Sequence, residues 1–427
     1  MTDFYTALCA SENRSPSERE QAHFQALPRQ VEHALQTTAA FAEILQGVDP
    51  DSVINRTRLA QLPVTRKTEL LERQKAARAM TASATTSADI FGGFSSLTYG
   101  EHMLRVFASP GTIYEPEGTR KDYWRAARAL SAAGFKAGDL IHNCFSYHFT
   151  PAGAMMESGA HALGCTVFPA GTGQTEQQVQ AMAELKPAGY IGTPSFLKII
   201  LEKAAEMGVA LPSVTKALVS GEACPPSLRD WFAERGVAAY QCYATADLGL
   251  IAYETSAREG LVLDEGVIVE IVRPGTGDPV PEGEVGELVV TTLNPDYPLI
   301  RFGTGDLSAV LSGTCPTGRT NTRIKGWMGR ADQTTKIRGM FVHPGQINTI
   351  AKRFPEVVKA RLVVTGEMAN DAMTLRVETA CSGPDALAAK IGEAIRDVTK
   401  LRGDVELVAP GSLPNDGRVI EDARSYK

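Results

Sequence analysis

The sequence has little of what marks secreted, membrane-spanning or nucleic-acid-binding proteins. Its seven cysteines are scattered and none lies in a C-x-x-C spacing, so a disulfide framework is not indicated. No apolar run approaches the length of a transmembrane helix, and the amino terminus is polar and acidic, unlike a signal peptide. We therefore expect a cytoplasmic protein whose thiols are reduced.

The chain also lacks a field of one charge sign. Lys and Arg number 43 and Asp and Glu 49, which gives a net charge of −6, and the charges are interspersed. Neither a nucleic acid nor a membrane surface is an expected partner. With 427 residues, 43% of them hydrophobic, the chain is long enough for about two or three domains with buried cores.

The middle of the sequence has the pattern of a parallel α/β sheet. Between about residues 122 and 245, amphipathic stretches alternate with the apolar runs DLIHNCF, CTVFPA, AGYIGTP, TKALVSGE and AAYQCYAT. This alternation predicts right-handed crossovers with helices on both faces of the sheet. Ligands of such sheets bind at the carboxyl ends of the strands, which here carry SYHF, PAGTGQ, TPSF, SGEA and YATAD.

The flanking segments have other patterns. A capping box at Ser15 to Glu18, with Pro16 at the first helical position, predicts a helix that Pro28 should kink or split. After residue 250, Gly- and Pro-rich turns separate short strands, which is typical of an antiparallel β subdomain. The last ninety or so residues mix helix and strand patterns and are expected to form a small α+β domain.

The most informative motifs lie between these last two regions. They read R-F-G-T-G-D at 301–306, G-R-A-D at 329–332 and R-G at 338–339. R-x-x-T-G-D alone also suits a Gly-rich turn with an exposed Asp, but the combination resembles the signature of adenylate-forming enzymes, the acyl-CoA synthetase superfamily. In detail the chain resembles the phenylacetate–CoA ligase branch, over about residues 18–427. Further matching segments are LPVTRKTEL, HNCFSYHFTPAG, LGCTVFPAGTGQTEQQV, GTPSF, SGEACP, YATADLG and ELVAPGSLPNDGRV.

The resemblance implies both a domain division and an activity. Residues 1–331 would form an AMP-binding N-terminal domain, with its β subdomain at about 252–331, and residues 332–427 a small mobile lid domain. The family uses ATP to activate a carboxylic acid as an acyl-adenylate, releases pyrophosphate, and passes the acyl group to coenzyme A. ATP, Mg²⁺, coenzyme A and a small carboxylic acid are therefore the implied ligands, and a homodimer is implied as well.

Several residues match the family's nucleotide-binding positions. Asp306 is the carboxylate that accepts hydrogen bonds from the two ribose hydroxyls. Arg330 would reach the same ribose or a nearby phosphate, and Gly221–Glu222 would line the base. Tyr243 matches the aromatic residue that stacks on adenine; its alternative is a core aromatic at a strand end.

The phosphate loop departs from the family pattern S-S-G-T-T-G-x-P, whose backbone N–H groups wrap the phosphates. The matching residues that are kept are Ser109, Gly111, Thr112 and Pro116. The replacements are Ile113, Tyr114, Glu115 and Glu117. Two carboxylates therefore stand where negatively charged phosphates must approach.

Three further positions concern the metal, the catalytic cation and the hinge. Asp247 falls where the family holds Mg²⁺ against the phosphates. Arg418 takes the place of the family's catalytic Lys in L-P-x-x-x-G-K; it keeps the charge but presents a planar fork, and a solvated surface Arg is the alternative. The hinge residue between the domains corresponds to Asp332.

Many relatives in this branch also carry a structural zinc, whose ligand positions correspond here to Thr255, Val262, Cys315 and Thr317. One thiol cannot complete a tetrahedral zinc site, so we expect no structural zinc.

By resemblance, the acyl pocket is walled by Tyr147, His148, Phe149, Pro194 and Phe196. Such walls suit a flat aryl or arylacetic acid. A core position is the alternative for Phe149 and Phe196, and a structural histidine is the alternative for His148.

Two functions are consistent with these observations. One is an acid–thiol ligase acting on an aromatic carboxylate, favoured by Asp247, Asp306, Arg330, Asp332 and Gly339. The other is a non-catalytic or impaired family member that binds nucleotide, acid or a partner without turnover, favoured by Ile113, Tyr114, Glu115, Ala246 and Arg418.

Overall fold

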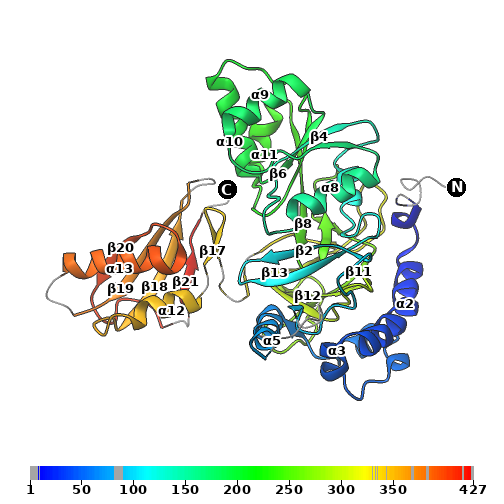
Figure 1. Ribbon diagram of the computed structural model, residues 1–427, viewed down its shortest axis with the longest axis horizontal. Coiled ribbons are helices and arrows are strands. Elements are labelled where there is room, and N and C mark those ends of the chain that lie inside the picture. Colours follow the sequence, from blue (N-terminus) through cyan, green and yellow to red (C-terminus); the bar gives the residue numbers. More distant parts are fainter. Residues whose placement is uncertain are drawn as a thin grey trace. The chain divides into compact units, whose positions relative to one another are not determined.

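The computed structural model describes residues 8, 10–80, 90–328, 330–331, 333, 335–342, 344–366, 370–380, 384–415 and 418–424. The chain forms two compact units, Met1–Met328 and Gly329–Lys427, which are drawn in Figure 1. The first is a mixed α/β unit and the second an α+β unit, which confirms the predicted fold class.

A sheet of nine strands forms the centre of the first unit, and five of these strands are parallel, in the order β5-β4-β6-β7-β8. They are β4 (Leu140–Asn143), β5 (Thr166–Phe168), β6 (Gly189–Gly192), β7 (Lys216–Val219) and β8 (Ala238–Thr245). Each comes from one of the predicted apolar runs. Every residue of β6 is buried, as expected for a parallel strand with helices on both faces.

Helices alternate with these strands as predicted. They are α7 (Ala127–Ala132), α8 (Ala152–Ala162), α9 (Thr175–Leu185), α10 (Pro194–Glu206) and α11 (Pro226–Ala233). Figure 1 shows α9, α10 and α11 gathered around β4 and β6. Helix α10 begins after Thr193, whose side chain caps it, with Pro194 at the first helical position.

The strands of the expected β subdomain are divided between two sheets. Those that extend the parallel sheet beyond β8 are β9 (Gly249–Tyr253), β10 (Leu261–Leu263), β14 (Val310–Leu311) and β15 (Arg323–Ile324). Those that form a second sheet are β11 (Val267–Val272), β12 (Gly286–Thr292), β13 (Phe302–Ser308) and the distant β1 (Thr65–Arg66). The pattern of strands and turns does not encode this division, because partner choice depends on long-range packing.

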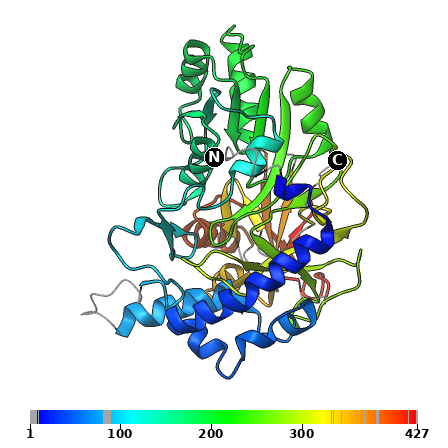
Figure 2. The same ribbon diagram turned by 90° about the vertical axis from the view of Figure 1, so that its right-hand side faces the viewer.

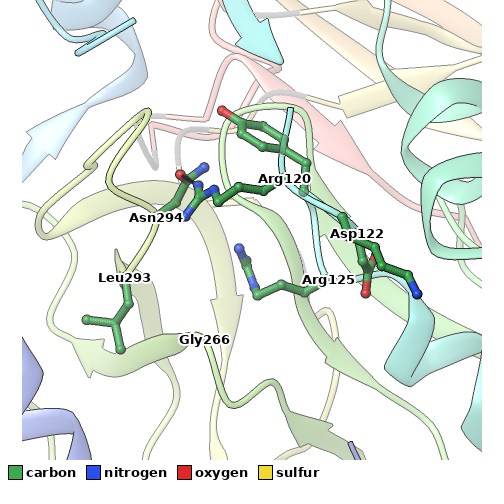
Figure 3. A pocket seen from close by; sticks show the side chains of 8 residues that line it. Arg120, Asp122, Arg125, Gly266, Leu293 and Asn294 are labelled. Atoms are coloured by element: carbon green, nitrogen blue, oxygen red, sulfur yellow. Dashed lines mark hydrogen bonds between the residues drawn. The ribbon is translucent and has the colours of Figure 1, made fainter. Parts of the chain in front are cut away.

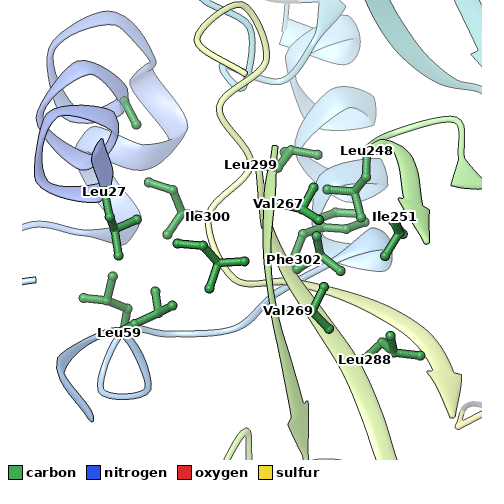
Figure 4. Packing of buried hydrophobic residues seen from close by; sticks show 14 of the residues in the cluster. Leu27, Leu59, Leu248, Ile251, Val267, Val269, Leu288, Leu299, Ile300 and Phe302 are labelled. Atoms are coloured by element: carbon green, nitrogen blue, oxygen red, sulfur yellow. The ribbon is translucent and has the colours of Figure 1, made fainter. Parts of the chain in front are cut away.

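The amino-terminal helices cover the second sheet. They are α2 (Pro16–Thr37), α3 (Ala39–Ile44), η1 (Pro50–Ser52), α4 (Arg56–Leu59) and α5 (Lys67–Met80). Figures 1 and 2 both show α2, α3 and α5 at the end of this unit opposite α9, α10 and α11. In Figure 4, Leu27 of α2 lies beside Leu59 and Ile300 in the buried cluster.

The predicted start of α2 is confirmed, because Ser15 and Glu18 form the capping box. Of the two outcomes predicted for Pro28, a kink or a split, the split does not occur, since α2 runs through this residue. Leu27 and Val31, one on each side of Pro28, are fully buried, and this packing outweighs the one backbone hydrogen bond that proline removes. Within the described part of the chain, no helix is both long and apolar enough to cross a membrane.

The second unit has its own buried cluster and two sheets. Its elements are β16 (Thr335–Ile337), β17 (Met340–Val342), α12 (Pro344–Lys352), β18 (Lys359–Thr365), β19 (Ala372–Glu378), α13 (Pro384–Thr399), β20 (Asp404–Val408) and β21 (Ile420–Asp422). The main sheet has the order β20-β19-β18-β21. The mixed helix and strand patterns of this region predicted an α+β domain, whereas the three-residue strands β16, β17 and β21 are too short to show a periodic pattern.

Candidate functional site

Asp306, the predicted ribose ligand, lies on β13 and is 7% exposed. Both carboxylate oxygens accept a hydrogen bond from an aromatic side chain. Tyr243 Oη donates to Oδ2 at 2.7 Å, and Trp327 Nε1 donates to Oδ1 at 3.0 Å. The structure thus brings the predicted pair of Tyr243 and Asp306 together. Tyr243 is half-buried and also packs against the buried hydrophobic cluster of this unit, so its ring contacts the core while its hydroxyl reaches Asp306.

Arg301, the first residue of the same motif, is a structural residue. It is 2% exposed and makes a two-pronged ion pair with Glu270, with N–O distances of 3.0 and 3.1 Å. Its guanidinium also donates to the carbonyls of Ala60 and Gly277. All these contacts lie inside the protein, so Arg301 fixes the start of the strand that presents Asp306.

The predicted phosphate loop is the turn and inner part of a β-hairpin. Strands β2 (Met103–Ser109) and β3 (Ile113–Gly118) pair antiparallel, and Gly111 and Thr112 lie exposed at the turn with φ values of 99° and 60°. A buried Gln74 on α5 bonds to both the N–H and the carbonyl of Tyr114 at 2.8 Å. The backbone of Tyr114 is therefore already hydrogen-bonded within the protein.

Glu115 on β3 faces Asp247, which lies in the turn after β8; they are 2% and 7% exposed. Ser109 Oγ donates to Glu115 Oε1 at 2.7 Å, and Lys67 Nζ pairs with Asp247 Oδ2 at 2.9 Å. Glu115 Oε2 and Asp247 Oδ1 are enclosed without a hydrogen-bond partner among the described residues. Burial and then the charge of Asp247 raise the pKa of Glu115 well above its usual value.

Three residues around these carboxylates were not predicted as their partners. Lys67 lies in the segment LPVTRKTEL, and Glu115 departs from the family pattern of the phosphate loop. Trp327 stands directly before Met328 and the G-R-A-D segment. The available signals were the acidic Glu115 within a strand and the cationic Lys67 within a matching segment. Their partners lie far away in the sequence, so neither signal identified the contact.

The predicted acyl-pocket residues 147–149 lie in the loop after β4. Tyr147 Oη donates to Glu157 Oε2 at 2.7 Å and accepts from Asn143 Nδ2 at 2.8 Å. Burial and then the Glu157 hydrogen bond raise the pKa of Tyr147. His148 is exposed and Phe149 is 80% exposed, so the structural-histidine and core alternatives for these two are wrong.

Phe149 is held in an unusual backbone conformation, with φ of 60°. Its carbonyl accepts the N–H of Ala108 at 2.8 Å, which joins the pocket loop to the hairpin of the phosphate region. At the end of β6, Pro194 is buried and Phe196 is half-buried. Gly221 and Glu222 form a bend after β7, with Gly221 exposed at φ 81°.

The remaining predicted residues belong to the second unit or fall outside the description. Arg330 is half-buried, and Arg418 is exposed, two residues before β21. Asp332, the predicted hinge, lies outside the described residues. Lys359 Nζ donates to Asn415 Oδ1 at 2.7 Å, which ties the loop before Arg418 to β18.

The positions that match the zinc ligands of relatives are brought together. Thr255 Oγ1 and Thr317 Oγ1 lie 3.3 and 3.1 Å from Cys315 Sγ. Val262 is buried in the same apolar cluster. Across the described ranges, no group of three or more His, Cys, Asp or Glu residues is arranged to hold a metal ion. The absence of zinc remains a prediction for elemental analysis.

A cavity of about 200 Å³ in the first unit contains none of the predicted residues. It is lined by Arg120, Lys121, Asp122, Tyr123, Arg125, Gly266, Leu293 and Asn294. Figure 3 shows Arg120 and Asn294 pointing toward one another, and the two are hydrogen-bonded. Arg125 is paired with Asp264 at 2.6 Å, so this cation of the lining already has a carboxylate partner within the protein.

Comparisons with known proteins cover both units. Residues 120–294 match the AMP-binding enzyme family, and residues 339–422 match the AMP-binding enzyme C-terminal domain. The phenylacetate-coenzyme A ligase of Thermus thermophilus is 30% identical over 91% of this chain and 92% of its own length. That of Escherichia coli is 28% identical, covering 96% and 95%. A structure of 2-hydroxyisobutyryl-CoA ligase with 2-HIB-AMP and CoA, in the thioesterification state, is 25% identical with a TM-score of 0.81, covering 97% and 92%.

Proposed function

We propose that this chain, which belongs to the AMP-binding enzyme family, activates a carboxylic acid with ATP as an acyl-adenylate and transfers the acyl group to coenzyme A. The observation that carries the proposal is the buried Asp306 carboxylate, which Tyr243 orients through a hydrogen bond to Oδ2. A carboxylate fixed in this way accepts the two ribose hydroxyls in charge-assisted bonds. The near full-length similarity to phenylacetate-coenzyme A ligases supports both half-reactions.

In this proposal the adenosine lies along the ends of β7, β8 and β13. Tyr243 presents its ring to adenine while its hydroxyl stays on Asp306. The bend at Gly221 and Glu222 lines the base, and its exposed glycine lets the ligand approach the backbone. Arg330, from the second unit, supplies a charge for the ribose or a phosphate.

The phosphates lie toward the hairpin turn at Ser109, Gly111 and Thr112. Asp247 is the residue that would hold Mg²⁺, which neutralises phosphate charge when it is bound. The orphaned Oδ1 of Asp247 fits that role, because a buried carboxylate oxygen without a donor is satisfied by a cation. Lys67, whose side chain is 38% exposed, adds a second positive charge at the same carboxylate.

The acid occupies the region of Tyr147, His148, Phe149, Pro194 and Phe196. The exposed ring of Phe149 and the half-buried ring of Phe196 offer aromatic surface, which supports an aryl or arylacetic substrate. Arg418 neutralises the charge that develops between the acid and the α-phosphate, and rotation of the second unit about Asp332 separates the half-reactions. Assembly as a homodimer completes the proposal.

The test is carboxylate-dependent exchange of pyrophosphate into ATP, followed by thioester formation with coenzyme A. We expect exchange with aryl or arylacetic acids, a loss of roughly 10²–10³-fold in Arg418→Ala, and retained or higher exchange in Arg418→Lys. Equal exchange in all three proteins would show that Arg418 is a solvated surface residue. No exchange with any acid tested would refute the ligase proposal.

One observation favours a second candidate, a family member that binds without turnover. The hairpin places the buried carboxyl of Glu115 beside Asp247, and the Tyr114 backbone is hydrogen-bonded to Gln74. Such a loop offers fewer backbone donors to phosphates than the family pattern does. Calorimetric binding of nucleotide or acid without pyrophosphate exchange would support this candidate.

A further inference from the structure

Residues 411–415 of the second unit are fastened to its main sheet by charged side chains. Lys359, the first residue of β18, donates from Nζ at 2.7 Å to both the carbonyl of Pro414 and Asn415 Oδ1. A longer bond of 3.4 Å reaches the carbonyl of Leu413. Because an ammonium has three N–H bonds, this one side chain holds three consecutive residues of the segment.

The residue directly opposite Lys359 completes this attachment. In the ladder of β18 and β19, Lys359 pairs with Glu378, which is 3% exposed. Glu378 Oε1 accepts the N–H of Leu413 at 2.6 Å. The buried Arg361, also on β18, donates from Nη2 to the carbonyl of Pro414 at 3.1 Å. Cations thus bind the carbonyls of the segment while a carboxylate binds its N–H, and these charge-assisted bonds fix its backbone.

Arg418 lies three positions beyond this segment, and the residue after it is anchored as well. The N–H of Val419 donates to Gln333 Oε1 at 2.7 Å, and the carbonyl of Val419 accepts the N–H of Leu362 at 2.9 Å. Arg418 itself is exposed. An exposed cation therefore stands between two anchored stretches of backbone. A cation that only meets water gains nothing from such anchors, whereas one that must meet a developing charge does.

The bonds of Lys359 are poorly placed to stabilise the fold. Pro414 and Asn415 are exposed, and Lys359 is half-buried. Hydrogen bonds in such a place replace bonds to water, so their net contribution to stability is small. Their main effect is on the conformation of the segment that leads to Arg418.

We propose that Lys359 and Glu378 form a clamp that positions Arg418, by holding the backbone before it in one conformation. The guanidinium then meets the acid and the α-phosphate without first being ordered. The inference rests on the proposed function for the role of Arg418. Lys359 is a positioning residue, because it acts through the backbone and not on the reacting atoms. A displacement of about 1 Å in a catalytic group can cost up to roughly a hundredfold in rate, so a clamp away from the chemistry has a large effect.

The first measurement needs no substrate. Lys359→Met keeps a long side chain and removes the ammonium. In hydrogen–deuterium exchange of the full-length, nucleotide-free protein, the peptide that contains Leu413 should exchange at least about tenfold faster in Lys359→Met than in the unmodified protein. The matched control is Arg376→Met, which removes a long cation from β19 that pairs with Glu406 at 2.9 Å. Amide exchange of the same peptide should be unchanged in this control.

The second measurement is carboxylate-dependent ATP–pyrophosphate exchange. Lys359→Met should lower kcat by roughly 10–100-fold and leave KM for ATP nearly unchanged, because Arg418 acts on the transition state. Lys359→Arg keeps a cation with donors for the same carbonyls and should retain most of the rate. In an Arg418→Ala background, Lys359→Met should cost no more than about twofold, since it acts only through Arg418. A merely structural residue would lower activity equally in both backgrounds.

Two results would overturn the proposal: unchanged amide exchange in Lys359→Met, or an equal loss of pyrophosphate exchange in the Arg418→Ala background. Thermal unfolding of each variant shows whether it is folded. If Lys359→Met does not fold, Glu378→Gln takes its place; it weakens the bond to the Leu413 N–H and should act in the same direction. Faster amide exchange in Lys359→Met, in a protein that shows no pyrophosphate exchange, would support the clamp and refute the ligase. Pyrophosphate exchange that Lys359→Met leaves unchanged would refute the clamp and support the ligase.

Discussion

Asp306 and Asp247 are both carboxylates with 7% exposure, at the proposed ribose and phosphate ends of one site, but their surroundings differ. Each oxygen of Asp306 accepts from an aromatic donor of the protein. Asp247 has a donor on one oxygen and faces a second carboxyl with the other. The ribose end is therefore satisfied by the protein itself, whereas the phosphate end keeps a carboxylate oxygen on Asp247 that no described donor satisfies.

The two carboxylates differ in how firmly the fold positions the groups around them. At the ribose end, the donors lie on β8 and just after β15, whose positions are set by the sheet. At the phosphate end, one carboxyl comes from the hairpin and the other from a turn. A ligand that supplies positive charge therefore has its largest electrostatic effect at the phosphate end, beside Asp247.

The largest effect on stability is expected from removing the buried ion pair between Arg301 and Glu270, which fixes the start of the strand that carries Asp306. Arg301→Ala leaves Glu270 as an unpaired buried charge and should lower the free energy of unfolding by about 3–5 kcal/mol. Denaturant unfolding measures this change. Lys198→Ala, which removes an exposed helix ion pair with Glu202, is the control and should change stability by less than about 1 kcal/mol. Similar losses in both variants would contradict a special role for Arg301.

The next effect concerns nucleotide affinity. Asp306→Ala removes the acceptor of the ribose hydroxyls and should weaken ATP binding by about 1.5–3 kcal/mol, the usual contribution of a hydrogen bond to a charged group. Isothermal titration calorimetry of folded protein measures it. Asp306→Asn, which keeps the shape and one acceptor oxygen, should lose less. If the unmodified protein binds no adenine nucleotide, the assignment of the ribose end is wrong.

Local patterns were sufficient to predict most of the fold. The strands and helices between residues 122 and 245 follow from apolar runs and amphipathic stretches, and the start of α2 follows from its capping box. The failures have a common physical origin. The division of later strands between two sheets, the pairing of β1 with β13, and the intact α2 at Pro28 all depend on packing between distant segments.

The candidate site divides in the same way. Asp306, Tyr243 and Asp247 were predicted because they stand in motifs that the family resemblance identifies. Trp327, Lys67 and Glu115 were missed as partners because their contacts join residues 21, 180 and more than 100 positions apart, which no local pattern encodes. The structural role of Arg301 was hidden for the same reason, since its carboxylate partner Glu270 lies 31 residues away.

The smallest effect is expected from a substitution of Trp327. It tests whether the hydrogen bonds that satisfy Asp306 in the free protein help or hinder ribose binding. The indole ring is 40% exposed, while the carboxylate it contacts is nearly buried, so the indole covers Asp306 from the solvent side. A ribose that reaches Oδ1 must compete with the indole N–H. Trp327→Phe keeps an aromatic ring but removes this donor.

We therefore expect Trp327→Phe to bind ATP more tightly, by roughly fivefold, because the net contribution of one lost hydrogen bond is about 1 kcal/mol. Asp306→Ala in the Trp327→Phe background should abolish the gain, since both act through the same carboxylate. Calorimetry gives the affinities, and the indole fluorescence of the unmodified protein should change on nucleotide binding by an amount that is absent in Trp327→Phe. Weaker ATP binding in Trp327→Phe would contradict this prediction. It would mean that the indole orients Asp306 for the ribose instead of competing with the ribose for Oδ1. The hydrogen bonds that Asp306 accepts in the free protein would then also support its binding of the ribose.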